Sequence, residues 1–450
     1  MSSETLTPPI SCPPDWPLVR LHEIARKIGS GATPTGGQAA YQPLRTGFAL
    51  IRSQNVFDRT FSNAGLAFIS EAQAHGLRGV QLELHDLLLN ITGDGVTFGR
   101  ACMVPGEVLP ACVNQHVSII RLDSERADPG YVLSYLTHPT IKEYIEAFNA
   151  GGSRRAITKA HIESFVVPLP PLTVQREISQ VLGALDDRIA LLRETNATLE
   201  AIAQALFKSW FVDFDPVRAK SQGLAPAGMD EATAALFPDS FEESALGALP
   251  TGWSAATLAE VFEINPVRTL KKGAVAPYLD MASVGTIGQC VERPVLREFG
   301  SGTKFRNGDT LLARITPCLE NGKSAFVDFL DSDHVGWGST EFIVLRPKAP
   351  FPEYMGYLLC RHMPFREYAI RSMSGTSGRQ RVQNDVLGRY PLAVPTHAVA
   401  AAFAELVNPL QQAIASNHAR AQTLATLLDT LLPRLISGQI RLPEAEEALA

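Results

Sequence analysis

The sequence has few of the patterns that mark secreted, membrane-spanning or metal-binding proteins. Its six cysteines include no Cys-x-x-Cys pair, and its ten histidines form no ligand-spaced cluster with them. No apolar run reaches roughly 18 residues, and the N-terminal stretch lacks the basic segment and apolar core of a signal peptide. We therefore expect no disulfide framework, no metal site and no transmembrane helix, and we expect a cytoplasmic protein.

The chain also lacks an excess of positive charge. Its net charge is −6, and acidic residues gather at residues 230–243 and in the C-terminal tail, whereas arginine and lysine lie in short segments such as GGSRR and KKG. A globally acidic chain can still bind a polyanion through local basic loops, so the net charge neither supports nor excludes nucleic-acid binding. With 450 residues, 45% of them hydrophobic and 19% charged, the composition is that of an ordinary soluble chain of two or three domains.

Signs of catalytic chemistry are equally scarce. Asp213 and Asp215 have no third ligand nearby, and Pro238-Asp239 lacks the downstream acid-x-Lys arrangement of a nuclease site. The sequence contains neither an Asn-Pro-Pro-aromatic methyltransferase motif nor a GxxxxGK[ST] phosphate loop. We therefore predict no catalytic residues, and we expect the chain to bind no cofactor or metal of its own.

The most regular feature present is an apolar seam that occurs twice. In each copy, apolar residues recur at alternating steps of four and three, which is the heptad pattern of a coiled coil. One asparagine interrupts each seam and would penalise a wrong register at some cost in stability. The first seam comprises Ile178, Leu182, Leu185, Ile189, Leu192, Asn196, Leu199, Ala203 and Leu206, and the second comprises Phe403, Val407, Leu410, Ile414, Asn417, Ala421, Leu424, Leu428 and Leu431.

The two seams belong to a wider internal duplication. The pattern after Trp16 recurs after Trp253, at an offset of 237 residues. The segments GRACMV and GKSAFV match at an offset of 223, and the two seams match at 225. We interpret the change of offset from 237 to 223 and then to 225 as loop insertions and deletions between two copies of one unit.

Each copy consists of a mixed part followed by a long helix. Short aliphatic runs such as DLLLNIT, HVSIIRL and FIVLRP are bounded by Gly, Pro and Asp, which predicts strands, and a helical pattern follows HVSIIRL. The fold class is therefore α+β, with two tandem α/β domains related by a pseudo-two-fold axis and two long helices forming an antiparallel coiled coil. The expected boundaries are domain 1 at 1–171, helix 1 at 172–212, a linker at 213–248, domain 2 at 249–395, helix 2 at 396–436 and a tail at 437–450.

The antiparallel orientation predicts a specific register. If Asn196 lies opposite Asn417, the remaining layers pair apolar residues, from Leu182 with Leu431 to Leu206 with Val407, and the two amides can satisfy each other. At 1.5 Å per residue the first seam rises about 42 Å, which would hold the two domains apart as a rigid spacer. Such a spacer suits a protein that reads two separated half-sites on one duplex, although periodicity alone favours a dimer-like scaffold.

Two segments carry a resemblance to a known family. ALDDRIALLRETNATLEAIAQALFKSWFVDFDPVRAK resembles the central conserved region of the specificity subunits of type I restriction-modification systems, and FPDSFEESALGALPTGW resembles the passage into their second target recognition domain. The second copy departs from the family's Pro-Pro-Leu-x-x-Gln motif before its helix, and the first lacks a glycine before Trp16.

The resemblance implies a DNA sequence-specificity subunit that is no enzyme by itself. Each recognition domain would read one half of a bipartite site on double-stranded DNA, and the helices would set the spacer and dock two methyltransferase subunits, which motor-nuclease subunits join. S-adenosylmethionine, ATP and Mg would then bind the partner subunits. Two alternatives stay open: a coiled-coil assembly scaffold that binds no DNA, and a stand-alone enzyme with a diverged site.

Candidate DNA-binding residues follow from chemistry and position. Basic residues in Gly-rich loops suit phosphate oxygens, and polar residues in Gly-rich turns suit base edges, although turn formation alone explains many of them. At the end of the first long helix, an adjacent aromatic pair is a candidate partner surface. The DNA-binding candidates are Thr92, Asp94, Thr97, Arg100, Arg154, Arg155, Lys159, Arg314, Thr316, Asn321, Lys323, Arg379 and Arg381, and the partner-binding candidates are Trp210 and Phe211.

Overall fold

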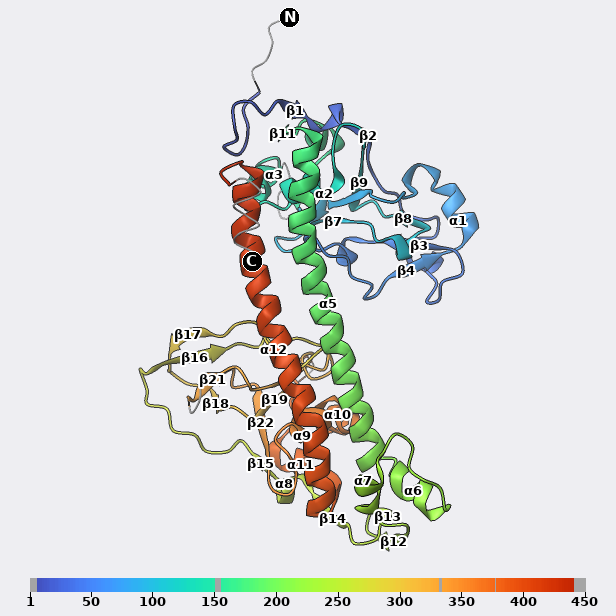
Figure 1. Cartoon of the computed structure of the whole chain (residues 1–450), viewed down its shortest axis with the longest axis vertical. Coiled ribbons are helices and arrows are strands. Elements are labelled where there is room, and N and C mark those ends of the chain that lie inside the picture. Colours follow the sequence, from blue (N-terminus) through green and yellow to red (C-terminus); the bar gives the residue numbers. More distant parts are fainter. Residues whose placement is uncertain (1–5, 150–154, 332–333, 377, 441–450) are drawn as a thin grey trace, which may run out of the picture. The chain divides into compact units, whose positions relative to one another are not determined.

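The chain divides into two compact units. In a computed structural model, which describes residues 6–149, 155–331, 334–376 and 378–440, unit 1 comprises residues 1–190 and 423–450, and unit 2 comprises residues 191–422. Two 40-residue helices, α5 (Leu172–Phe211, green in Figure 1) and α12 (His397–Ile436, red), each contribute one part to each unit.

Unit 1 contains a four-stranded antiparallel sheet of order β2-β9-β5-β7 and a three-stranded sheet of order β4-β3-β8. The strand before α5 pairs with the first strand of the unit, β11 with β1. The strands are β1 (Leu18–Arg20), β2 (Ala25–Ser30), β3 (Phe48–Ile51), β4 (Ala67–Ile69), β5 (Leu87–Asn90), β6 (Thr92–Gly93), β7 (Ala101–Met103), β8 (Ala111–Val113), β9 (Val117–Leu122), β10 (Arg155–Ala156) and β11 (Val166–Pro168). The shorter helices are α1 (Glu71–Gly76), α2 (Pro129–Leu136), α3 (Pro139–Ala147) and α4 (Lys159–Glu163).

Unit 2 repeats this plan with sheets of order β15-β22-β19-β20 and β17-β16-β21-β18. Here too the strand before the long helix, β23, pairs with a strand near the start of the repeat, β14. The strands are β12 (Phe241–Ser244), β13 (Gly247–Pro250), β14 (Ser254–Thr257), β15 (Phe262–Ile264), β16 (Val275–Leu279), β17 (Val295–Glu298), β18 (Thr303–Phe305), β19 (Thr310–Ala313), β20 (Ser324–Phe326), β21 (Gly336–Gly338), β22 (Phe342–Pro347) and β23 (Pro391–Val394). The shorter helices are α6 (Asp215–Ser221), α7 (Glu231–Ala235), α8 (Leu258–Val261), α9 (Met355–Arg361), α10 (Met363–Arg371) and α11 (Asn384–Leu387).

The central strands of the sheets β2-β9-β5-β7 and β15-β22-β19-β20 are apolar on both faces because each of these two sheets lies between two cores. In β5, Leu87 and Leu89 join the core that includes α2 and α5, whereas Leu88 joins the core around the three-stranded sheet. In β19, Leu312 and Leu311 divide in the same way between two cores. Strands buried on both sides read as continuous apolar runs rather than alternating ones, which explains DLLLNIT and HVSIIRL.

The two long helices pack against each other within each unit. In unit 2, Phe211 of α5 contacts Phe403 of α12 with ring centroids 4.7 Å apart, and Asn196 lies beside Ile414 and Asn417, so the residue numbers run in opposite directions. In unit 1, seam residues of both helices share one core, among them Leu182 and Leu431. The buried side chains lie at the spacing of the seams, which is how a heptad pattern hides its apolar stripe.

The expected mixture of helices and strands is confirmed, and the segment expected as a linker has structure of its own. Between residues 213 and 248 lie α6, α7 and the hairpin of β12 with β13. Val217 and Phe237 are buried in the core of unit 2, and the ammonium of Lys220 donates to the carbonyl oxygen of Ala234 at 3.0 Å. Apolar residues at these positions anchor the connection, so it is a packed part of unit 2.

Within the described residues, no helix is long and apolar enough to cross a membrane. In the same part of the chain, no three histidine, cysteine or acidic side chains lie where they could hold a metal ion together.

Candidate nucleic-acid interface

Three segments of unit 1 meet at one end of its four-stranded sheet and form what we term site 1, residues 91–93, 114–116 and 155–157. The amide of Ile91 donates to the carbonyl oxygen of His116 at 3.0 Å, and the amide of Ile157 donates to that of Ile91 at 3.0 Å. The short strands β6 and β10 pair beside these bonds, with Arg155 opposite Gly93. Residues far apart in sequence are thereby fixed next to one another.

In unit 2 the same pattern of backbone hydrogen bonds joins three segments that we term site 2, residues 314–316, 339–341 and 380–382. The amide of Arg314 donates to the carbonyl oxygen of Glu341 at 2.9 Å, and the amide of Val382 donates to that of Arg314 at 3.0 Å. An isolated bridge pairs Ile315 with Arg381. The duplication therefore preserves not only the sheets but also the junction of these three segments.

The side chains of site 1 are mostly uncharged, and a series of hydrogen bonds connects them. The hydroxyl of Thr92 lies 2.6 Å from Nδ1 of His116, and Nε2 of Gln115 lies 3.1 Å from Nε2 of the same ring. The hydroxyl of Thr33 donates to Oε1 of Gln115 at 2.6 Å. Arg155 adds one positive charge, balanced by an ion pair with Glu146 of α3 at 2.5 Å.

The side chains of site 2 are charged. Nε of Arg381 donates to both carboxylate oxygens of Glu341, at 3.0 and 2.9 Å, and Nη2 donates to Oε1 at 2.6 Å. These hydrogen bonds from Arg381 lower the pKa of Glu341 and raise that of Arg381, and the charge of Arg314 lowers the pKa of Glu341 further. Arg314 itself donates to Gln383 at 3.2 Å. Sites 1 and 2 thus share the same backbone hydrogen bonds but differ in their polar side chains.

The remaining candidates of unit 1 lie around site 1 in several roles. Asp94 accepts hydrogen bonds from the amides of Val96 and Thr97 and from the Thr97 hydroxyl, which lowers the pKa of its carboxyl and closes the turn, so Asp94 and Thr97 are turn formers rather than free base readers. Arg100 stacks on the ring of Phe57, with its guanidinium carbon 4.5 Å from the ring centroid. Lys159 begins α4 and pairs with Glu163 at 3.4 Å, whereas Arg154 lies outside the described residues.

Arg314, Thr316 and Arg381 come together in site 2, and Arg379 is exposed two residues before Arg381. The hydroxyl of Thr316 donates to the carbonyl oxygen of Gln380 at 3.4 Å. Asn321 is exposed in the turn before Lys323, whose ammonium donates to the carbonyl oxygen of Met281 at 2.7 Å. Lys323 is therefore occupied within its own unit, which its position in a Gly-containing turn did not indicate.

Comparisons with known proteins agree with this architecture. A profile of the type I restriction modification DNA specificity domain matches residues 81–201. The type I restriction enzyme HindI specificity subunit of Haemophilus influenzae is 24% identical over 393 residues, covering 76% of this chain and 84% of the relative. The MjaIX specificity subunit of Methanocaldococcus jannaschii is 22% identical over 336 residues, covering 70% and 71%. The chain is thus similar to type I specificity subunits over most of its length.

The fold is also similar to that of a solved structure. The crystal structure of the type I restriction-modification system S subunit from M. genitalium matches with a TM-score of 0.53 at 14% sequence identity, covering 96% of this chain and 99% of that one. At this identity the match speaks for the fold alone.

Sequence reasoning missed four polar residues at or beside sites 1 and 2, namely Gln115, His116, Glu341 and Gln383. His116 and Glu341 occupy the same place in the two frames, and they are 225 residues apart, which is the offset of the two seams. That offset was a usable signal, because it aligns the turns before β9 and β22. The same pattern of backbone hydrogen bonds places Gln380 opposite Thr316, just as Arg155 lies opposite Gly93. Arg155 therefore corresponds to Gln380 and not to Arg381.

The structure contradicts the expected partner surface at Trp210 and Phe211. Their side chains are only 3% and 7% exposed, and both pack against Phe403 of α12. Trp210 also meets Phe237 edge-on at 4.9 Å. The physical reason is that Phe207 and Trp210 continue the seam from Ala203 at steps of four and three, so they face the core.

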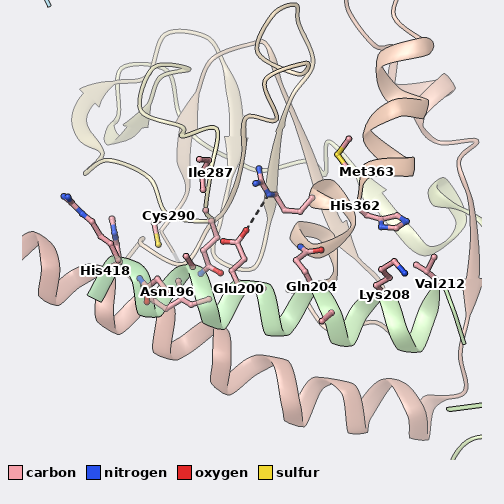
Figure 2. A pocket seen from close by; sticks show the side chains of 18 of the residues that line it. Asn196, Glu200, Gln204, Lys208, Val212, Ile287, Cys290, His362, Met363 and His418 are labelled. Atoms are coloured by element: carbon pink, nitrogen blue, oxygen red, sulfur yellow. Dashed lines mark hydrogen bonds and ion pairs between the residues drawn. The ribbon is translucent and has the colours of Figure 1, made fainter. Parts of the chain in front are cut away.

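A groove of about 930 Å³ runs along α5 in unit 2 and offers a different surface (Figure 2). Asn196, Glu200 and Gln204 line it from α5, and Ile287 and Met363 stand at its edge with exposures of 78% and 55%. At its floor Glu200 accepts a hydrogen bond from the Tyr357 hydroxyl at 2.7 Å and pairs with Arg361 at 3.6 Å. Exposed apolar side chains gathered beside a groove are typical of an interaction surface.

Proposed function

We propose that this chain is the DNA sequence-specificity subunit of a type I restriction-modification complex, in which units 1 and 2 each read one half of a bipartite target. One observation carries the proposal: sites 1 and 2 share the same backbone hydrogen bonds but present different polar side chains. Reading two different half-sites requires the same backbone arrangement with different side chains. Base contacts from side chains specify the sequence, whereas the backbone only positions those side chains.

The side chains of the two junctions suit base edges. Glutamine pairs with adenine, arginine with guanine, and threonine with several bases in the major groove. Gln115 and Thr92 supply such groups in site 1, and Arg314 and Arg381 supply them in site 2. Arg379 and Lys159, which are exposed beside the junctions, suit phosphate oxygens, as does Arg154 by its position in the sequence.

We further propose that the two recognition domains, residues 1–171 and 249–395, are arranged in tandem about a pseudo-two-fold axis, with α5 and α12 as the spacer between them. The paired seams and the asparagine contact within unit 2 support a fixed register, and a fixed register would give a fixed spacing between half-sites.

The helices would also dock two methyltransferase subunits, joined by motor-nuclease subunits. Exposed apolar side chains support this docking: Leu191 and Ile202 on α5, and Leu406 on α12. The groove edged by Ile287 and Met363 adds exposed apolar side chains beside α5 in unit 2. In this assembly the chain performs no chemistry, and S-adenosylmethionine, ATP and Mg belong to the partner subunits.

Band shifts test the proposal. The chain assembled with its methyltransferase subunits is expected to retain a duplex of random sequence at modest salt. The double variant Arg154→Ala with Arg155→Ala should weaken binding on all sequences and lower the slope of log affinity against log salt by about 0.9 per lost phosphate contact. The matched control replaces Arg26 and Arg126, two exposed arginines of unit 1 outside site 1, and should change binding little.

The scaffold alternative makes the opposite prediction. If the assembly forms but retains no duplex at any salt concentration, the chain is a protein scaffold and the proposed function fails.

A further inference from the structure

We propose that Arg381 reads a guanine in the half-site bound by unit 2, and that Glu341 is the positioning residue that aims it. This inference rests on the proposed function, and it assigns one base of the target to one pair of side chains.

The geometry of the pair leaves one face of the guanidinium available. Glu341 occupies the side of Arg381 formed by Nε and Nη2, with donor-to-acceptor distances of 2.6 to 3.0 Å. Nη1 donates to the carbonyl oxygen of Arg379 at 3.3 Å. A guanidinium has five N–H donors, of which Nε carries one and each terminal nitrogen two. One N–H on Nη1 and one on Nη2 therefore have no partner among the described residues.

The end-on face of the guanidinium lies between Nη1 and Nη2. The Nη2 donor that Glu341 leaves free points to this face, and Nη1 keeps one donor besides the one bonded to Arg379. In the major groove, guanine presents O6 and N7 as adjacent acceptors, and a bidentate arginine is the commonest contact to them. The side chain of Arg381 is 38% exposed, so the fork can be reached while its other side is held. Glu341 thus binds the side of the guanidinium formed by Nε and Nη2. The end formed by Nη1 and Nη2, which matches O6 and N7 of guanine, stays accessible.

Backbone hydrogen bonds hold both partners in place. The amide of Arg381 donates to the carbonyl oxygen of Ser374 at 2.9 Å, and the amide of Ser374 donates back to Arg381 at 3.0 Å. The amide of Glu341 donates to the hydroxyl of Ser339 at 3.2 Å, while its carbonyl oxygen accepts from the amide of Arg314. A side chain held at both ends loses less conformational freedom when it binds.

The charge of the pair argues against a phosphate contact. Arginine also binds phosphate through two donors, but that contact draws its strength from an uncompensated cation that displaces counterions. Glu341 neutralises Arg381 and would place a carboxylate beside the phosphate. A base edge carries no net charge, and a carboxylate there can accept from the amino group of a cytosine.

Site 1 has no equivalent pair. The bridge of Ile315 with Arg381 corresponds to the pairing of Thr92 with Ala156, so an alanine stands where Arg381 stands, and His116 stands in the place of Glu341. The guanine contact should therefore belong to one half-site only.

The experiment uses the complete complex with its methyltransferase subunits and determines the methylated motif by sequencing. With Arg381→Ala, one guanine position in one half-site should become permissive, with a loss of discrimination of roughly 5- to 150-fold, while affinity for random duplex stays near that of the unchanged complex. Arg381→Lys keeps the charge but loses the fork, and it should relax the same position. The control Arg371→Ala removes an arginine of unit 2 whose side chain is 80% exposed and should leave the motif unchanged.

Two further measurements separate reading from a merely structural role. Glu341→Gln removes a negative charge, so discrimination at the guanine should fall while affinity for random duplex holds or rises; a structural defect would lower both. Replacing that guanine by 7-deazaguanine, which lacks the N7 acceptor, should weaken binding of the unchanged complex and have little further effect on Arg381→Ala.

Two results would overturn the inference. One is a motif that Arg381→Ala leaves unchanged. The other is an equal loss of affinity on all duplexes with a reduced salt slope, which identifies a phosphate contact. If the unchanged complex yields no motif at all, the proposed function itself has failed, which is a distinct outcome.

Discussion

Asn417 and Asn196 meet across the two long helices within unit 2. The amide nitrogen of Asn417 donates to the amide oxygen of Asn196 at 3.0 Å, and the amide nitrogen of Asn196 donates to the carbonyl oxygen of Ile414 at 3.0 Å. Each polar group that the seam buries therefore has a partner, which is the condition for keeping such a residue in an apolar interface. A shift of one helix by one heptad would leave each asparagine facing an apolar layer.

Replacing one asparagine should cost more than replacing both. Asn196→Leu leaves the Asn417 amide opposite an apolar side chain, and we expect a loss of about 1 to 2 kcal/mol in the free energy of unfolding. Asn196→Leu with Asn417→Leu removes both polar groups and should recover most of that loss. Urea titrations of the full chain measure the difference. The account of this contact is contradicted if the two single-site losses simply add.

The contact between Arg59 and Asp186 should be the strongest ion pair between α5 and the rest of unit 1. The side chain of Arg59 is only 9% exposed, and it donates to Asp186 at 2.6 and 2.8 Å and to the Ser134 hydroxyl at 2.8 Å. Asp186→Ala leaves a buried guanidinium unpaired, and we expect about 3 kcal/mol of destabilisation. The neighbouring Asp187 is exposed, so Asp187→Ala is the matched control and should change stability by less than about 0.5 kcal/mol.

Asp328 should make unit 2 less stable as pH rises. Burial raises the pKa of its carboxyl to about 6, against hydrogen bonds from Gln411 at 2.7 Å and Gln289 at 3.3 Å that lower it. Because the folded pKa lies above the unfolded one, the stabilising contribution is fully present below about pH 4 and is lost as pH rises to about 6.

Asp328→Asn should therefore stabilise the chain above pH 7, by up to about 3 kcal/mol, and have little effect near pH 4. Denaturant titrations at several pH values measure this, with the exposed Asp331→Asn as the control. A benefit that is the same at both pH values would contradict the burial of an ionised Asp328.

Trp210 should matter for folding rather than for partner binding. Its side chain packs among Phe211, Phe237 and Phe403, so Trp210→Ala should cost about 3 to 5 kcal/mol by leaving a cavity in the core. Ile287→Ala, at the exposed edge of the groove, should leave the melting temperature unchanged and weaken assembly with the methyltransferase subunit. A folded Trp210→Ala chain with weakened assembly would restore the interpretation of Trp210 as a partner surface.

The sequence predicted the helices, the strands and the duplication because these are written in local patterns. A heptad seam needs only one helix to be recognised, and the buried strands β5 and β9 need only their apolar runs. The inward orientation of Trp210 followed from the same pattern, since Phe207 and Trp210 extend the seam, but the aromatic pair at a helix end favoured a surface interpretation.

The chemistry of the two junctions could not be predicted in the same way. Arg381 and Glu341 are 40 residues apart in sequence, and their contact depends on the turn before β22 meeting the segment after α10. Likewise, Lys323 bonds the carbonyl of Met281, 42 residues away. Residue type and a Gly-rich neighbourhood identify a loop, whereas the loop's partners are set by strand pairing and loop lengths.

The central claim, that each unit reads its own half of a bipartite target, is tested most directly by sequencing methylated DNA. A host carrying the complete system would express the unchanged chain, His116→Ala in site 1 or Arg381→Ala in site 2. The account predicts two short half-sites with a fixed gap, of which His116→Ala alters one and Arg381→Ala alters only the other. A motif that is absent, or two half-sites that both change with a single variant, would contradict it.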